Sequence, residues 1–334
     1  MKVLVNGRFL SRQVTGVERY AQEILRCLAD GMRVVRPHPG VQRAGGHAWE
    51  QFILPGHIHS GEILWSPANT GPLAVANQVL TLHDLTLLEH PEWFTPAFSL
   101  WYRLFVPMLV KRVRHLVVSS EHVRNKILLR FSLSPERVTV VSGGVDLNHF
   151  HPNHPAPRRF YARYVLFVGS LQPRKNLGVL LAAWDQIAHR FPDIWLLAAG
   201  VENHHYRQVP LSRGVKNVRF LGYVPEADLP GYYAGAMAFV IPSLDEGFGL
   251  PVLEAMACGT PVIAARTGAL PEVVGKAGLF FDPVHPAQLA ETLASCLSDA
   301  KLRSDLAEKG LSHVKTFSWQ VSAEKLWKVL KTCL

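Results

Sequence analysis

Short apolar runs, each long enough for one strand, alternate with longer amphipathic segments in the first half of the chain. We expect strands at residues 3–6, 79–84, 115–120 and 137–146. A helix should follow Thr15 and extend to about Ala29, because Thr15 and Glu18 have capping-box spacing. Several runs end in Ser, Gly or Asp, which is typical of strands in a doubly wound parallel sheet.

The same alternation starts again after residues 148–159, a segment rich in proline and histidine that we interpret as an interdomain linker. A helix is predicted over residues 177–190. Strands are expected at residues 164–170, 194–200, 218–224, 237–243 and 260–265. The pattern predicts an α/β fold with two Rossmann-like, doubly wound domains facing a central cleft, where ligands bind beyond the carboxyl ends of the strands.

Composition narrows the class of protein. The 334 residues are 48% hydrophobic and 18% charged, which suits two domains with sizeable cores. The apolar runs are strand-sized, and we interpret the first residues as a strand, not a signal peptide. The four cysteines are scattered without zinc or CxxC spacing, so we expect a reduced cytosolic environment and no structural metal.

The net charge of +9 suggests an anionic partner. The basic excess is spread evenly over both halves, which argues against a nucleic-acid-binding tail.

The stretch SLDEGFGLPVLEAMACGTPVIAA, residues 243–265, has the most informative pattern. Pro251 suits the first turn of a helix and Gly259 its end, so Glu246 should lie on a loop and Glu254 one turn inside the helix. Helix N-termini bind phosphate, and carboxylates accept hydrogen bonds from diols. The pair therefore indicates a nucleotide-sugar site. An ordinary loop–helix junction with solvated acids is the alternative, and spacing alone does not choose between them.

Two adjacent cations, Arg174 and Lys175, follow the strand at residues 164–170 and precede a helix. They are suited to neutralising a pyrophosphate and stabilising a nucleotide diphosphate as it leaves. The alternative is a solvated basic turn, which an isolated pair would favour. The position directly after a strand favours phosphate binding.

Taken together, these segments resemble the retaining glycosyltransferases of family 4, which have the GT-B fold. The resemblance extends over nearly the whole chain. Its motifs, in order, are TGVERYAQEIL, LHD, HPEWF, SSE, GGVD, VGSLQPRKN, the two glutamates with seven residues between them, TGALPEVVG and FSWQ. One departure lies at residues 142–143, where Ser-Gly stands in place of the Pro-Asn that relatives often have.

The resemblance implies a role for each matching residue. Arg174 and Lys175 would bind the donor diphosphate. Glu246 would face the donor sugar in a binding and electrostatic role, and Glu254 would hold the ribose hydroxyls. His83 would approach the donor sugar as a candidate base, with packing at a strand end as the alternative. Further implied donor contacts are Gly16, Asp84, Phe248, Gly249 and Leu250.

The family transfers with retention, usually without a metal, and implies no cofactor besides the donor substrate. This fits the lack of a clear DxD motif, since the basic pair and a helix dipole can carry the donor charge. Retention by double displacement needs a carboxylate nucleophile. The resemblance favours front-side attack instead, with the leaving phosphate helping to deprotonate the acceptor.

Two segments bear on the substrates. Residues 222–229 should form the base pocket, with Val224 in its wall and Glu226 accepting hydrogen bonds from guanine, which favours GDP-mannose. Glu226 capping a helix after Pro225 is the alternative, and UDP- and dTDP-sugars stay open. Residues 93–116 are amphipathic with a basic end that suits an anionic membrane near a polyprenyl-diphosphate-linked glycan. Most of their aromatic side chains should instead pack in the first domain.

The sequence therefore predicts a metal-independent, retaining hexosyltransferase of polysaccharide biosynthesis, such as lipopolysaccharide assembly. It would be cytoplasmic and, if it contacts lipid, peripheral at the inner face of the plasma membrane. We assign residues 1–150 to an acceptor-side domain, 151–316 to a donor domain and 317–334 to a helix returning to the first. The alternatives are an epimerase or phosphorylase of the same fold, or a non-catalytic nucleotide-sugar-binding scaffold.

Overall fold

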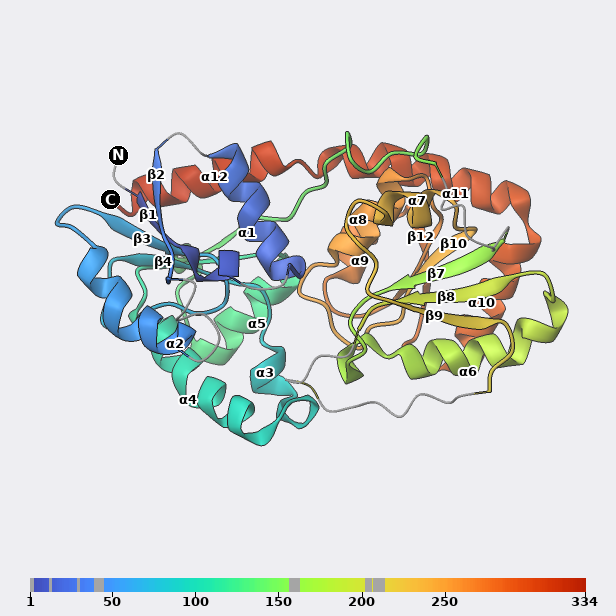
Figure 1. Cartoon of the computed structure of the whole chain (residues 1–334), viewed down its shortest axis with the longest axis horizontal. Coiled ribbons are helices and arrows are strands. Elements are labelled where there is room, and N and C mark those ends of the chain that lie inside the picture. Colours follow the sequence, from blue (N-terminus) through green and yellow to red (C-terminus); the bar gives the residue numbers. More distant parts are fainter. Residues whose placement is uncertain are drawn as a thin grey trace. The chain divides into compact units, whose positions relative to one another are not determined.

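The computed structural model describes residues 3–11, 14–28, 31–38, 45–155, 163–201, 206 and 214–334. It contains two six-stranded sheets, and the strands within each sheet are parallel (Figure 1). This confirms the predicted pair of doubly wound α/β sheets.

The first sheet has the strand order β2-β1-β3-β4-β5-β6. Its strands are β1 (Val3–Asn6), β2 (Met32–Val35), β3 (Ile63–Ser66), β4 (Gln78–Leu82), β5 (His115–Val118) and β6 (Val138–Val140). The second sheet has the order β12-β11-β10-β7-β8-β9. Its strands are β7 (Tyr164–Val168), β8 (Trp195–Ala199), β9 (Val218–Gly222), β10 (Ala238–Ile241), β11 (Val262–Ala265) and β12 (Gly278–Phe281).

The chain forms two compact units. The first comprises Met1–Glu89, Pro96–Gly144 and Ser318–Leu334, and the second His90–Thr95 and Val145–Phe317. Helices of the first unit are α1 (Gly16–Cys27), α2 (Gly46–Ala48), α3 (Thr86–Glu89), α4 (Pro96–Arg112), α5 (Glu121–Phe131) and α12 (Trp319–Thr332). Helices of the second are α6 (Leu177–Ile187), α7 (Leu229–Ala234), α8 (Leu250–Ala257), α9 (Leu270–Val274), α10 (Pro286–Ser298) and α11 (Ala300–His313). The assignment of acceptor and donor domains stays a prediction.

Burial explains which strands the sequence pattern predicted. The central strands β1, β4, β10 and β11 are buried along their whole length, as expected for parallel strands covered on both faces. The sequence analysis missed β2, β3 and β12. Of these, β2 and β12 are edge strands with partly exposed side chains, whereas β3 is buried along its whole length, so burial does not explain why it was missed.

Helix boundaries follow the predicted capping residues. The Glu18 carboxylate accepts a hydrogen bond from the Thr15 backbone N–H at 3.2 Å, and α1 starts at the next residue, Gly16. Pro251 is the second residue of α8, and Gly259 follows its end with a φ of +72°. Ala29 and residues 156–159 of the predicted linker lie outside the described residues.

The helices of the second unit cover its sheet in two groups (Figure 1). Helix α6 packs against α10, whereas α8 packs against α7, α9 and α11. In the first unit, α12 lies along α1. Within the described ranges, we find no helix whose length and apolar character would let it cross a membrane.

Both sheets have a point at which the chain reverses its direction across the sheet. In the first, β2 and β3 lie on opposite sides of β1, and in the second, β8 and β10 lie on opposite sides of β7. The loops that leave two such strands diverge and open a crevice at their carboxyl ends, where ligands of this fold class bind. The segments after β7 and β10 contain the predicted diphosphate and sugar residues Arg174, Lys175, Glu246 and Glu254.

Candidate active site

A buried ion cluster occupies the reversal point of the second sheet. Arg174 Nη1 donates to Glu246 Oε2 at 2.7 Å, and Lys175 Nζ donates to Glu246 Oε1 at 2.5 Å. Ser243 Oγ donates to the same Oε1 at 2.6 Å. Glu246 is only 5% exposed and Lys175 8%. The basic turn is therefore not the solvated alternative, because its cations pair with a carboxylate that lies 71 and 72 residues further along the chain.

The environment keeps the Glu246 carboxylate ionised. Burial by itself raises the pKa of a carboxyl group, but the charges of Arg174 and Lys175 and the hydrogen bonds from Lys175 and Ser243 lower the pKa of Glu246 to about 2. Glu246 therefore cannot serve as a proton donor near neutral pH. Its chemistry is that of a fixed negative charge and a hydrogen-bond acceptor.

The loop after β11 holds the Glu246 backbone in place. The Ala269 backbone N–H donates to the Glu246 carbonyl at 2.9 Å, and Thr267 Oγ1 donates to the Leu244 carbonyl at 2.8 Å. Gly268 has a φ of +59°, and a Cβ atom there would lie 2.5 Å from the Glu246 backbone nitrogen. Only glycine fits this contact. Sequence reasoning missed its role, although the segment TGALPEVVG was part of the family resemblance.

Asn176 connects three of the loops by hydrogen bonds. It has a φ of +51° and ends the short turn that contains Arg174 and Lys175. Its Nδ2 donates to the Pro242 carbonyl at 3.1 Å and to the Pro283 carbonyl at 2.8 Å. The segments that follow β7, β10 and β12 are thus joined by one amide side chain.

The start of α8 lies directly after this cluster. Gly249 has a φ of +106° and precedes Leu250, the first residue of α8. The Phe248 ring is buried, with its centroid 6.0 Å from that of Phe317. Glu254 is 4% exposed and accepts a hydrogen bond from Tyr233 Oη at 2.9 Å. Both glutamates are thus buried, and the alternative of a junction with solvated acids is wrong.

The proposed base-reading residues lie beyond the end of β9. Val224 is half-buried, and Glu226 is exposed in the turn before α7. Asp228 occupies the N-cap position of α7 without a side-chain capping hydrogen bond, so Glu226 does not occupy that position. Whether Glu226 reads a base stays a prediction.

In the first unit, His83 directly follows β4 and is 8% exposed. Its Nε2 lies 2.9 Å from the Pro67 carbonyl and must carry the proton of that hydrogen bond, which leaves Nδ1 with the lone pair in the neutral ring. The Tyr20 ring packs edge-on at 4.9 Å. Burial lowers the pKa of His83, and the Pro67 carbonyl and nearby carboxylates only partly oppose it. A neutral ring with a basic Nδ1 suits a proton acceptor, and the packing suits the structural alternative equally well.

Gly16 and Asp84 each stand at the start of a helix. Gly16 is the first residue of α1, and Asp84 Oδ1 accepts a hydrogen bond from the Thr86 backbone N–H at 3.0 Å at the start of α3. Glu18, in the first turn of α1, is buried, and its charge partly opposes the lowering of the His83 pKa. The donor contacts of Gly16 and Asp84 stay predictions.

Sequence reasoning also missed a buried polar network at the reversal point of the first sheet. Glu50 Oε1 accepts hydrogen bonds from Asn6 Nδ2 at 2.6 Å and from Thr70 Oγ1 at 3.1 Å, and it pairs with Arg8 Nε at 3.2 Å. All four residues are buried. The polar residues directly after β1 were the available signal.

Comparisons with known proteins now decide the family. Residues 157–313 match the family described as glycosyl transferases group 1, and residues 51–149 match glycosyltransferase family 4. The O-antigen chain mannosyltransferase B of Escherichia coli is 32% identical over 287 residues, which cover 82% of this chain and 74% of that protein. The chain belongs to glycosyltransferase family 4. A D-inositol 3-phosphate glycosyltransferase of Corynebacterium efficiens is 34% identical over 293 residues, covering 81% of this chain and 69% of that protein.

Solved structures agree on the fold of this glycosyltransferase. Sucrose-phosphate synthase from Thermosynechococcus elongatus has a TM-score of 0.75 and 20% identity, covering 99% of this chain and 98% of that one. Anabaena HepE in complex with UDP and glucose has a TM-score of 0.75 and 18% identity, covering 99% of this chain and 100% of that one. The enzyme therefore has the GT-B fold, and as a family member it is a retaining glycosyltransferase that uses a nucleotide-sugar donor.

Replacing Glu246 by Gln should destabilise the enzyme in a pH-dependent way. The pKa falls from 4.5 to about 2 on folding, so the charge stabilises the fold fully above pH 4.5 and loses this effect as the pH falls towards 2. We expect the variant to lose on the order of 3 kcal/mol of unfolding free energy at pH 7, because the buried Lys175 and the half-buried Arg174 lose the carboxylate charge between them. Urea denaturation between pH 8 and pH 3 measures the difference, which should narrow below pH 4.5.

Glu308→Gln is the matched control, since Glu308 is exposed on α11 and its substitution should change the unfolding free energy little at any pH. A Glu246→Gln variant as stable as the wild-type enzyme at pH 7 would contradict the assignment.

Proposed function

We propose that this glycosyltransferase transfers mannose from GDP-mannose to a lipid-linked oligosaccharide in polysaccharide biosynthesis. The observation that carries the proposal is the Glu246 cluster at the reversal point of the second sheet. In the proposed complex, the diphosphate lies against Arg174, Lys175 and the start of α8, where backbone N–H groups favour an anion. Glu246 then faces the sugar, and Glu254 the ribose.

The cluster supports charge stabilisation over nucleophilic catalysis. The two Glu246 oxygens already accept hydrogen bonds from Arg174, Lys175 and Ser243, which lowers their nucleophilicity. In the proposed reaction, the bond from the anomeric carbon to the phosphate oxygen breaks while the acceptor hydroxyl attacks from the same face. The leaving diphosphate takes the hydroxyl proton, and the two cations stabilise its growing charge. A neutral His83 is the second candidate for the proton.

Different observations support the choice of the sugar and of the base. The O-antigen chain mannosyltransferase B among the relatives supports mannose, and the exposed Glu226 carboxylate supports guanine. The complex of HepE with UDP and glucose supports UDP-glucose as the competing donor. A scaffold without activity is disfavoured, because Arg174, Lys175, Glu246 and Glu254 are all present.

A thermal-shift panel with GDP, UDP, dTDP and ADP in EDTA tests the donor. We expect GDP to raise the Tm most, by the equivalent of about 2.7 kcal/mol at a hundredfold excess over Kd. Lys175→Met should abolish the shift, whereas Lys309→Met, at an exposed position of α11, should keep it. A larger shift with UDP would overturn the guanine assignment, and no shift with any nucleotide would overturn the donor site.

The acceptor's membrane is the second proposed partner. Helix α4 buries Tyr102 and Phe105 in the core of the first unit, as expected for its aromatic residues. Its other side exposes Leu100, Leu104 and Met108, which are four residues apart and 61%, 62% and 52% exposed. The helix ends with Lys111 and Arg112. An exposed aliphatic stripe with a basic end suits insertion into an anionic membrane surface.

Leu104→Glu should weaken sedimentation with vesicles that contain phosphatidylglycerol. A buried leucine contributes about 1.5–3 kcal/mol, so we expect at least a tenfold loss in partitioning. Leu129→Glu is the control, because Leu129 on α5 is 84% exposed outside the stripe. Equal sedimentation of both variants, or no preference of the wild-type enzyme for anionic vesicles, would contradict the proposal.

A further inference from the structure

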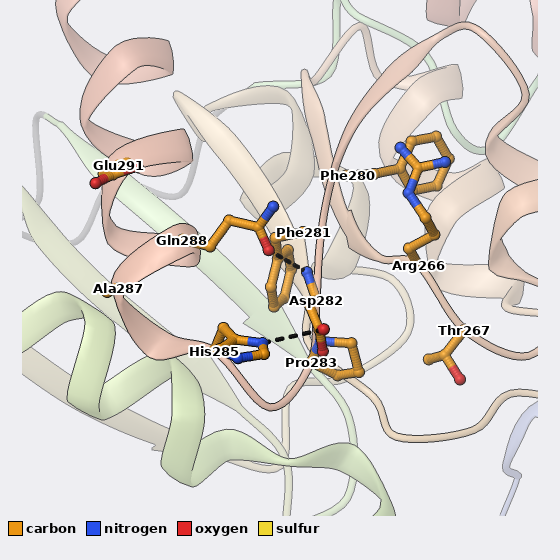
Figure 2. A pocket seen from close by; sticks show the side chains of 10 residues that line it. All are labelled: Arg266, Thr267, Phe280, Phe281, Asp282, Pro283, His285, Ala287, Gln288 and Glu291. Atoms are coloured by element: carbon orange, nitrogen blue, oxygen red, sulfur yellow. Dashed lines mark hydrogen bonds and ion pairs between the residues drawn. The ribbon is translucent and has the colours of Figure 1, made fainter.

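A pocket of about 740 Å³ opens at the carboxyl ends of β11 and β12, beside the start of α10. It is an open hollow, because most of its lining side chains, including those of Asp282, His285 and Glu291, are exposed. Figure 2 shows Arg266 over Phe280 at one end of the pocket and Glu291 at the other, with His285 and Gln288 turned towards Asp282. None of the predicted donor residues lines it.

The pocket is connected to the donor loops. Its wall residue Thr267 donates to the Leu244 carbonyl at 2.8 Å, two residues before Glu246. Its wall residue Pro283 accepts a hydrogen bond from Asn176, which follows Lys175, at 2.8 Å. In the strand order β12-β11-β10-β7, the pocket lies on the β12 side of the Glu246 cluster, and Val224 and Glu226 follow β9 at the opposite edge. A ligand in this pocket would therefore approach the donor from the side away from the nucleobase.

The lining chemistry favours a neutral, hydroxyl-rich ligand. Asp282 pairs with His285 at 3.0 Å, and Gln288 Oε1 accepts from the Asp282 backbone N–H at 2.7 Å. The Arg266 guanidinium lies 4.6 Å from the centroid of the Phe280 ring. Acids, a guanidinium, an imidazole and an amide together offer both donors and acceptors, as sugar hydroxyls require. The acids disfavour a second diphosphate.

We propose that this pocket binds a neutral hexose unit of the acceptor glycan, remote from the hydroxyl group that receives the sugar. The inference rests on the proposed transferase function. The second unit would then contribute to acceptor recognition. Polar side chains at the two ends would hold hydroxyl groups, and Ala287 would contact the apolar face of the ring.

Saturation-transfer NMR with mannotriose, maltotriose and cellotriose tests the pocket on the full chain. Ala287→Trp places an indole in the pocket, and Ala300→Trp makes the same change at an exposed alanine at the start of α11. We expect at least one trisaccharide to bind, Ala287→Trp to weaken it roughly tenfold or more, and Ala300→Trp to leave it unchanged. Glu291→Gln, a smaller change, should weaken it less.

Binding of no trisaccharide in the millimolar range would overturn the proposal, as would equal effects of the two tryptophan variants. A nucleotide titration of the same samples reads the donor site separately. Wild-type protein that binds a trisaccharide in the pocket but no nucleotide would support the pocket and overturn the proposed donor function. Nucleotide binding without trisaccharide binding would do the reverse.

Discussion

The pairing of the buried Glu246 carboxylate with the buried Lys175 and the half-buried Arg174 is the interaction on which the candidate donor site depends. An unpaired buried charge would cost several kcal/mol, so the Glu246 carboxylate and the Lys175 ammonium depend on each other, and Arg174 adds a second cation to the pair. Their pairing requires the loops after β7 and β10 to meet. Gly268, in the loop after β11, lets that contact close. The contact between these loops and the ionisation of Glu246 therefore depend on each other.

The proposed binding sites of the second unit follow the order of its strands. Along the sheet, β9 is followed by the turn with Val224 and Glu226, β7 and β10 carry the ion cluster, and the pocket opens at β12. The nucleobase would come first along the carboxyl ends of the strands. The diphosphate and sugar would follow, and the acceptor glycan would come last. In this account Glu246 orients and stabilises charge. In the proposed mechanism, the leaving diphosphate or His83 would take the proton, and burial lowers the pKa of His83, which favours its neutral form.

Local patterns predicted the central strands, the capping box at Thr15 and the helix between Pro251 and Gly259, because each depends on residues close in sequence. They also placed the two glutamates correctly on loop and helix. The pairing of Glu246 with Arg174 could not be predicted in this way, since it joins residues 72 apart and follows from strand order. The same holds for Asn6 and Glu50, 44 residues apart. Of the four edge strands, β2 and β12 were missed, and both have partly exposed side chains that weaken the apolar pattern.

A double-mutant cycle on Lys175→Met and Glu246→Gln, read as unfolding free energy at pH 7, measures the coupling between the two charges of the cluster. If the two side chains form one charge unit, removing both should cost less than the sum of the single losses, with a coupling of roughly 1–3 kcal/mol. Additive losses would show that the carboxylate and the lysine act independently. That result would contradict the account of the site.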